Sequence, residues 1–337
     1  MKRIFQLSFL ILGIVIGAGY ASGREIWLFF GPNGGRAILL FAVIFGVCCY
    51  SVLDISYQKQ TNHYQQILET IVNDKFAWLY DLLMFIYLIL TIVIMIAGSG
   101  AALEIYQLPS WVGIGLIAIM LVWAFSFSLD QVIEINTILL PILLITLLAI
   151  LTMFIKQEPA IEHVTVSKVN YFKAISFTSV NLLPIISVVG AVGKKIKTKK
   201  EVIYTAIISI IILAGLSYIY NYSLTLIQSE IDLFEMPIYG ILIRFPSFVL
   251  LFVTIIIWIA IFATAVGALL GLITRIQNNY QISQFKVAFI LTLLLVPFSL
   301  TGFQFLIELI YPAYGVLNLY LLLKLILYPV KDYRVEK

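Results

Sequence analysis

The sequence predicts an all-α integral membrane protein with ten transmembrane helices, arranged as two inverted five-helix repeats in which helices 1 and 6 are broken. The 337 residues are 62% hydrophobic and 11% charged, with a mean hydropathy of +1.07. Polar residues are therefore too few to cover a soluble domain. The apolar residues form ten segments of helical length, and a bilayer requires about 20 residues per helix. These segments divide into two sets of five.

The connections between the segments are mostly short. The longest ones span 58–75 and 156–173. The first contains Ile67, Leu68 and Ile71 among polar residues, which predicts a short amphipathic helix lying on the surface. The ten apolar segments are 4–30, 35–56, 77–103, 109–127, 131–155, 171–193, 201–228, 246–274, 285–301 and 303–328.

Lysine and arginine are distributed unevenly between the two sides of this arrangement. If all ten segments cross, fifteen of these residues lie on the side of the N-terminus, including the run KKIKTKK at 194–200, and six lie on the other. Because cytoplasmic loops carry the excess of positive charge, we expect a multi-pass protein of the cell (inner) membrane with cytoplasmic N- and C-termini. The net charge of +4 then reflects topology and does not indicate nucleic-acid binding. The expected partners are the lipid bilayer and a small-molecule solute.

The chain is expected to form a single membrane domain over 1–337, with a first five-helix repeat at 4–155 and an inverted repeat at 171–328. Five is odd, so the second repeat begins on the opposite side of the membrane, as in many secondary transporters. A signal peptide is the alternative for the start of the chain. The apolar run from Ile4 to Ser22 is long for a signal peptide.

The first segment of each repeat contains residues that disfavour a helix. In the first, GAGYASG at 17–23 contains three glycines, each of which costs about 1 kcal/mol in a helix interior. In the second, SFTSVNLLP at 176–184 combines hydroxyl side chains and Asn181 with Pro184, which removes a backbone donor. Interruptions at matching positions indicate a binding site near the membrane midplane.

An interrupted span frees backbone groups, which is tolerated only beside a cavity. The N–H groups at a helix start suit a carboxylate, and free carbonyls suit an ammonium group or a sodium ion. Both together match a zwitterionic amino acid. The alternative for the glycines is close packing of helices through small residues four apart, namely Gly13 with Gly17 and Gly19 with Gly23.

Charged residues inside the apolar segments are a second indication of function. Glu308 lies within the last segment, where a charge costs about 3 kcal/mol or more and requires a partner or a proton. Arg24 and Glu25 lie in the outer half of the first segment, and a pairing of Arg24 with Glu308 would close the outer side of the site. In the alternative, Arg24 and Glu25 mark the outer interface of the membrane.

No enzyme motif is present, because the sequence lacks a Gly-rich phosphate loop, HExxH and GxSxG. Cys48 and Cys49 are adjacent within an apolar run and read as small hydrophobic residues. His63 and His163 lie in polar loops a hundred residues apart. We therefore expect no enzyme activity, no metal site and no cofactor, apart from Na⁺ or H⁺ as a coupling ion.

The stretch IGAGYASGREIWLFFG at 16–31 resembles the opening motif of YkvI-type membrane proteins, a group within the amino acid–polyamine–organocation (APC) superfamily. The similarity extends in length and segment pattern over nearly the whole chain. It implies a LeuT-like fold with the first and sixth helices unwound around the substrate. It also implies transport of amino acids or similar small amines, commonly with sodium or protons.

The resemblance further implies roles for individual residues. An ion would bind carbonyls near Gly13 and Gly17 together with the hydroxyl of Thr264, and Arg24 and Glu308 would form the outer gate. The alternative for Thr264 is a hydrogen bond to its own helical turn. The implied substrate-binding residues are Gly17, Ala18, Gly19, Tyr20, Ala21, Ser22, Thr178, Ser179 and Asn181.

Two departures from the family leave the coupling ion open between Na⁺ and H⁺. Sodium-coupled relatives have two neighbouring hydroxyls on the eighth helix, whereas Thr264 is followed by Ala265. The fifth segment lacks the mid-span lysine of some proton-coupled relatives. The sequence thus predicts a secondary active transporter, a symporter of an amino acid or related amine that works by alternating access. The alternative is a non-transporting ligand-sensing membrane subunit with a transporter fold.

Overall fold

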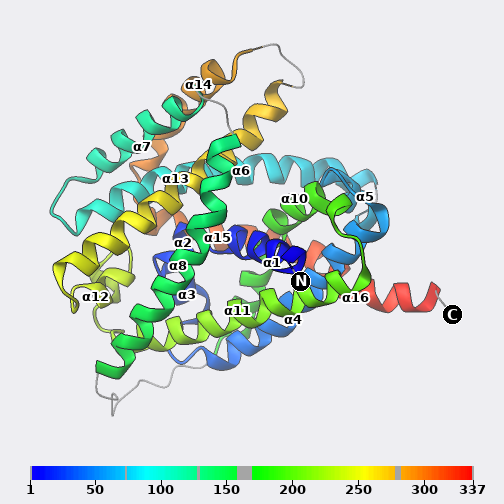
Figure 1. Ribbon diagram of the computed structural model, residues 1–337, viewed down its shortest axis with the longest axis horizontal. Helices are drawn as coiled ribbons and strands as arrows, with labels where there is room; N and C mark the ends of the chain where they lie inside the picture. Colours follow the sequence, from blue (N-terminus) through cyan, green and yellow to red (C-terminus); the bar gives the residue numbers. More distant parts are fainter. Residues whose placement is uncertain (1, 73, 127–129, 158–168, 278–281, 336–337) are drawn as a thin grey trace.

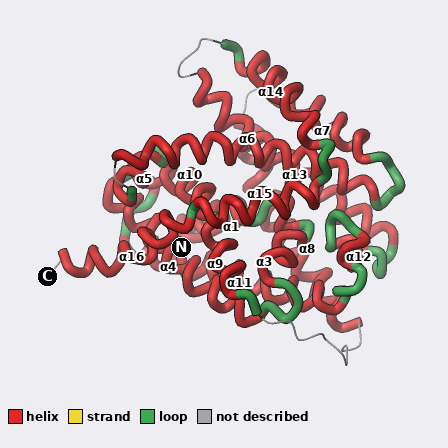
Figure 2. The backbone as a smooth tube through the Cα atoms, turned by 180° about the vertical axis from the view of Figure 1, so that it is seen from behind, coloured by secondary structure: helices red, strands yellow, loops and turns green. Residues whose placement is uncertain are grey.

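The computed structural model describes residues 2–72, 74–126, 130–157, 169–277 and 282–335. Within these ranges the regular structure is helical, as Figures 1 and 2 show. His163 lies outside the described residues. The α-helices are α1 Lys2–Val15, α2 Ala18–Ala21, α3 Arg24–Phe30, α4 Gly35–Lys59, α5 Gln65–Ile71, α6 Asp74–Glu104, α7 Ser110–Ala124, α8 Asp130–Gln157, α9 Tyr171–Val180, α10 Leu182–Val192, α11 Lys199–Leu226, α12 Ile238–Leu242, α13 Ser247–Gln277, α14 Gln284–Ser299, α15 Phe303–Leu317 and α16 Leu319–Val335, and the 3₁₀ turns are η1 Gly193–Lys195 and η2 Ile231–Leu233.

Six described segments are long and apolar enough to cross a membrane, namely those of α4, α6, α8, α11, α13 and the stretch Tyr171–Lys195, which contains α9 and α10. A seventh is the pair α14 and α15, which is bent by 100°. Shorter apolar helices lie at Arg3–Val15, Ser110–Ala124 and Leu319–Pro329. Each predicted segment therefore contains an apolar helix, and the chain is a multi-pass membrane protein. The count of ten spans stays a prediction.

The outer surface of the bundle is itself apolar. Trp78, Trp111, Ile119, Leu293 and Phe298 are large side chains that lie exposed on three different helices. A soluble protein rarely exposes so much apolar surface. Lipid is therefore the solvent that fits this surface.

The first predicted segment turns twice. α1 ends at Val15, the backbone of Gly17 is extended with φ −86° and ψ −170°, and α2 lasts a single turn. Gly23 then takes a left-handed conformation with φ 82° before α3 begins. Glycine adopts positive φ without the steric cost of a Cβ atom, so the turn into α3 depends on Gly23.

The sixth predicted segment is interrupted less. α9 ends at Val180 and α10 begins at Leu182, with Asn181 between them in a helical conformation. The side-chain amide of Asn181 donates to the Phe177 carbonyl at 2.8 Å. Pro184 has no N–H group to donate to the Val180 carbonyl. The interruption is therefore one residue long and is not an unwound stretch.

The two interrupted segments pack against each other in halves. α1 packs on α10 and α3 packs on α9, with the rings of Phe29 and Phe177 5.1 Å apart. Both views place α1 and α15 near the middle of the bundle (Figures 1 and 2). Because each half contacts its counterpart, the two interruptions lie at a similar level in the bundle.

The predicted helix in the 58–75 connection is present as α5. Its apolar residues Ile67, Leu68 and Ile71 are buried, because α5 packs against α4, α6, α10 and α16. The helix therefore covers one end of the protein and does not rest its apolar face on the membrane surface.

Candidate functional site

The four glycines of the first segment have different environments. A Cβ atom built at Gly13 would lie 3.1 Å from Leu140 on α8, and one at Gly23 would lie 2.9 Å from the hydroxyl of Tyr220. At Gly19 it would lie 2.7 Å from the carboxyl carbon of Glu25. At Gly17 it would meet no atom within 4 Å. Close helix packing therefore accounts for Gly13 and Gly23, and does not account for Gly17 or Gly19.

The carbonyls from Gly17 to Ser22 all accept hydrogen bonds. Four are paired with neighbouring residues of the same stretch. The other two are paired from outside, by the Tyr220 hydroxyl on Ala21 at 2.7 Å and by the Ile238 N–H on Ser22 at 2.9 Å. This stretch is therefore held by α11 and α12, and its carbonyls are already occupied.

The carbonyls just before this stretch are different. Among the described residues, no hydrogen-bond donor reaches the carbonyls of Gly13, Ile14, Val15 or Ile16. α2, which follows them, packs against α13. Thr264 on α13 donates its hydroxyl to the Ala260 carbonyl at 2.9 Å, which is the own-turn bond named above as the alternative. Ion binding by Gly13, Gly17 and Thr264 stays a prediction.

Glu25 is the residue of this region that sequence reasoning placed at an interface. It is 4% exposed, and its carboxyl group lies against Gly19. The backbone N–H of Tyr20 and the Tyr311 hydroxyl interact with this carboxyl group. One N–H group of the first interruption is therefore directed to a carboxyl group of the protein itself.

The surroundings of Glu25 are rich in tyrosine. Tyr87 on α6 lies close enough to interact with the Glu25 charge, and its ring packs at 5.5 Å on Tyr314 of α15. The Tyr20 side chain points to α11 instead, where its hydroxyl lies 2.9 Å from Ser217 Oγ. In the sequence these tyrosines look like ordinary core residues. The sequence feature that could have indicated a buried role for Glu25 is its position inside an apolar segment.

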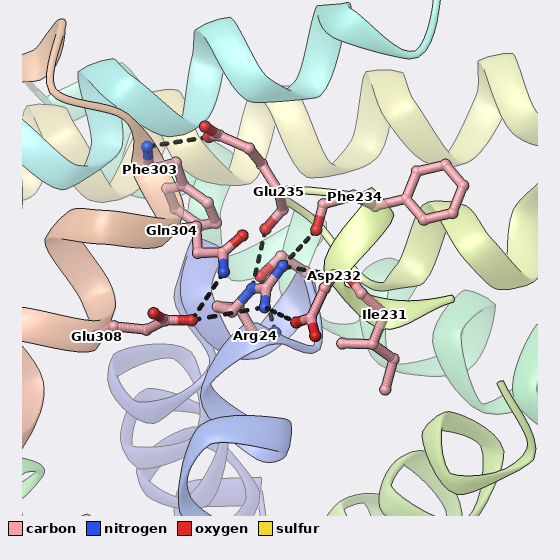
Figure 3. A network of polar contacts seen from close by, with 9 residues as sticks. Arg24, Ile231, Asp232, Phe234, Glu235, Phe303, Gln304 and Glu308 are labelled. Atoms are coloured by element: carbon pink, nitrogen blue, oxygen red, sulfur yellow. Dashed lines mark hydrogen bonds and ion pairs between the residues drawn. The ribbon is translucent and has the colours of Figure 1, made fainter. Parts of the chain in front are cut away.

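Arg24 points away from Glu25, into a set of oxygen atoms that we call the Arg24 network (Figure 3). Its guanidinium lies 3.6 Å from Glu308 Oε1 and 3.9 Å from Asp232 Oδ1. It donates to the carbonyls of Glu235, at 3.2 Å, and of Phe234. The Ile231 carbonyl accepts a further hydrogen bond at 3.5 Å. Arg24 is 1% exposed, so its guanidinium bonds to groups of the protein. The alternative that Arg24 and Glu25 mark the outer interface of the membrane stays a prediction.

The Arg24 network fastens one connection over the bundle. Residues 231–235 lie between α11 and α12, and Arg24 holds their carbonyls to the start of α3 (Figure 3). Glu235 Oε2 accepts the backbone N–H of Phe303 at 3.0 Å, which joins this connection to α15. Gln304 donates to Glu308 at 3.0 Å. The structure thus brings Arg24 and Glu308 together, within a wider network than the predicted pair.

The predicted residues of the sixth segment are buried at the end of α9. Thr178 donates to the Ala174 carbonyl at 3.2 Å, within its own helix. Ser179 and Ser176 have buried hydroxyls with no hydrogen-bond partner among the described residues. Ser176 lies against Gly315 of α15. The hydroxyl of Ser179 is therefore available to a ligand, whereas the Thr178 hydroxyl and the Asn181 side-chain amide already bond backbone carbonyls.

A second polar cluster lies at the C-terminal end of α13, and we call it the Tyr64 cluster. Arg275 pairs with both carboxylate oxygens of Asp81, and the Tyr64 hydroxyl donates to Asp81 as well. Burial, together with the hydrogen bond to Asp81, raises the pKa of Tyr64 well above its usual value, so the hydroxyl keeps its proton. Tyr64 also packs on Gly190 of α10. The cluster therefore joins α6, α10 and α13.

Two further features bear on what the protein binds. A cavity of about 410 Å³ lies between α1, α8 and α11, lined by apolar groups such as Phe9, Pro141 and Ile219. It offers no charged side chain to a polar solute. Among the described residues, no three His, Cys, Asp or Glu side chains are grouped as metal ligands.

Replacing Gly23 by alanine is expected to destabilise the protein by about 1–3 kcal/mol. A non-glycine residue with positive φ is strained by roughly that amount, and the new methyl group would press on the Tyr220 hydroxyl. Thermal unfolding in detergent measures the effect. Gly215→Ala is the control, because a Cβ atom there meets nothing within 4 Å. Equal stability of the two variants would contradict the role given to Gly23.

Several solved structures share this fold. The inward-facing form of Mhp1 matches with a TM-score of 0.60 at 11% identity, over 94% of this chain and 73% of Mhp1. A manganese transporter of Eremococcus coleocola matches with a TM-score of 0.53 at 13% identity, over 88% and 69%. A Na⁺-coupled sialic acid symporter matches with 0.50 at 14% identity, over 94% and 82%. At these identities the likeness concerns the fold, which is close to that of LeuT-fold transporters.

Sequence comparison gives closer relatives. No family model matches the chain. The uncharacterized membrane protein YkvI of Bacillus subtilis (strain 168) is 24% identical over 332 residues, which cover 93% of this chain and 92% of YkvI. The uncharacterized protein YyaD of the same organism is 39% identical over 322 residues, which cover 95% of both chains. With that identity over nearly its full length, the chain belongs to the YyaD family.

Proposed function

We propose that this protein is a secondary active transporter of a small organic solute, an amino acid or a related amine, within the APC superfamily. In this proposal ten spans form two inverted repeats, and both termini lie in the cytoplasm. The substrate binds between Gly17–Ser22 of the first segment and Thr178–Asn181 of the sixth, at the end of α9. A proton or sodium gradient drives uptake.

The observation that carries the proposal is the packing of the two interrupted segments, α1 on α10 and α3 on α9, inside a bundle with a transporter fold. Transport requires a site that can open to either side in turn. Interrupted helices provide such a site, because each half can move with its own packing partner. Among the described residues, the carbonyls of residues 13–16 and the Ser179 hydroxyl have no hydrogen-bond partner and can serve the solute.

Polar networks at the two ends of the bundle fit alternating access. The Arg24 network joins α3, α15 and the connection before α12. The Tyr64 cluster joins α6, α10 and α13. In the proposed orientation the first is the outer gate, with Arg24 and Glu308 as its charged pair, and the second is an inner gate. Both are formed in this structure, which corresponds to a closed state.

Uptake by the reconstituted protein tests the proposal. The full chain in liposomes is expected to accumulate at least one member of a panel of radiolabelled amino acids and amines when a proton or sodium gradient is imposed. Gly19→Leu, reconstituted in the same amount, is the control and should show no uptake, because its side chain would overlap Glu25. Binding without any flux would contradict transport and favour the sensing subunit.

A further inference from the structure

Glu25 is a buried acid without a counter-charge. Glu25 is 4% exposed, and among the described residues its carboxyl group takes part in no ion pair. Arg24, its neighbour in the chain, is directed to the Arg24 network (Figure 3). Burying a carboxylate without an opposite charge costs several kcal/mol, and a bound proton removes that cost.

The groups that face Glu25 are all neutral at ordinary pH. Tyr20 contributes its backbone N–H, and Tyr311 contributes its hydroxyl. The phenols of Tyr20 and Tyr87 also interact with the charge. Of the elements packed on α3, α9 contributes the Phe177 ring, and α11 contributes Tyr220, whose hydroxyl is used by Ala21.

We infer that Glu25 is the proton-binding group of this transporter and that protons drive it. The inference rests on the proposed function and names the coupling ion that the sequence left open. In the open state water reaches the Glu25 carboxylate, which takes up one proton to become a neutral carboxylic acid. The closed state buries that neutral acid. On the other side of the membrane, the acid returns its proton to water as the solute leaves.

The surroundings of the carboxyl group suit a proton better than a sodium ion. Sodium needs several oxygen atoms with free lone pairs around it. The groups that interact with Glu25 are instead a backbone N–H and a hydroxyl, and an N–H group repels a metal cation. After protonation the Tyr311 hydroxyl can turn and accept a hydrogen bond from the acid, because a phenol both donates and accepts.

The position of Glu25 connects protonation to the moving parts. Glu25 belongs to α3, it lies against Gly19 of α2, and it is bonded to Tyr311 of α15. Burying the charged form costs free energy at the contact of these three elements. The contact therefore closes readily only after Glu25 has taken up a proton.

Infrared titration of the full chain in liposomes tests proton binding directly. The C=O band of a protonated carboxyl group should appear in the wild type as pH falls, with a component that Glu25→Gln removes. Glu69→Gln is the control for an exposed acid on α5 and should keep that component. If Glu25→Gln leaves the titration unchanged, Glu25 binds no proton and the inference is wrong.

Transport measurements test the coupling. With the membrane potential clamped and a radiolabelled mixture of amino acids outside, a pH step of one unit should sustain about tenfold accumulation by the wild type at one proton per solute. Glu25→Gln resembles the protonated acid, so it should lose this accumulation entirely while still exchanging internal for external amino acids. Glu69→Gln should behave as the wild type.

The possible failures can be told apart. If the wild type moves no amino acid or amine, the proposed function is wrong, and the infrared titration still decides whether Glu25 binds a proton. If accumulation follows a sodium gradient and not a pH gradient, or if Glu25→Gln still accumulates solute, proton coupling through Glu25 is wrong. Loss of exchange as well as accumulation in a folded Glu25→Gln protein would also overturn it, by assigning Glu25 to solute binding.

Discussion

Replacing Gly19 by alanine is expected to abolish transport and to lower stability, whereas replacing Gly17 by alanine is expected to leave stability unchanged. A methyl group at Gly19 would lie 2.7 Å from the carboxyl carbon of Glu25. Glu25 must then move off its two hydrogen-bond donors, or the backbone must shift at the typical overpacking cost of about 1–3 kcal/mol. The same methyl group at Gly17 meets no atom within 4 Å, and the extended backbone there accepts any residue.

Initial rates of solute uptake, with thermal stability measured in parallel, check this pair of variants. The two glycines lie two residues apart in the same interruption. A difference between the variants therefore reports the different atoms around each glycine. If both variants transport equally well, the contact between Gly19 and Glu25 has no function. If Gly17→Ala is the inactive one, the open space beside Gly17 is the solute site and Glu25 is peripheral to it.

Replacing Arg24 by alanine is expected to cost about 3–5 kcal/mol of stability, the range for truncating a large, fully buried side chain to alanine. Arg24 is among the largest fully buried side chains, and its removal leaves the carbonyls of Phe234 and Glu235 without their donor. The connection before α12 should then detach from α3. Increased proteolysis of that connection, together with a lower Tm, would show it.

Variants of the same network separate charge from geometry. Asp232 is 90% exposed, so Asp232→Asn should change stability by less than about 1 kcal/mol, as for other surface ion pairs. Arg24→Lys keeps the charge but loses the planar fork of donors, so it should fall between the wild type and Arg24→Ala. A Tm for Arg24→Lys equal to that of the wild type would show that the carbonyl contacts contribute nothing.

Much of the fold follows from the sequence because lipid imposes it. A helix that crosses a bilayer needs a long apolar run, and such runs are visible without a structure. The position of the first interruption could also be predicted, because three glycines within seven residues seldom form a helix interior. The proximity of Arg24 and Glu308 followed from the cost of a lone charge within a span.

The environment of Glu25 could not be predicted in the same way. In the sequence, the adjacent residues Arg24 and Glu25 suggest a single polar site. The left-handed turn at Gly23 instead sets the start of α3 so that the two side chains diverge. Tyr87 and Tyr311 come from segments more than 200 positions apart, and only packing brings them to Glu25. The interruption of the sixth segment is also shorter than the sequence predicts, because the Asn181 side chain bonds a carbonyl of the preceding helix turn.

The divergence of Arg24 and Glu25 has a mechanical consequence. Successive residues of a helix are rotated by about 100° about its axis, so α3 directs Arg24 into the Arg24 network and Glu25 into the interior of the bundle. A rotation of α3 that releases Arg24 must also displace Glu25. Protonation of Glu25 and opening of the Arg24 network are therefore coupled, and the coupling acts equally in both directions.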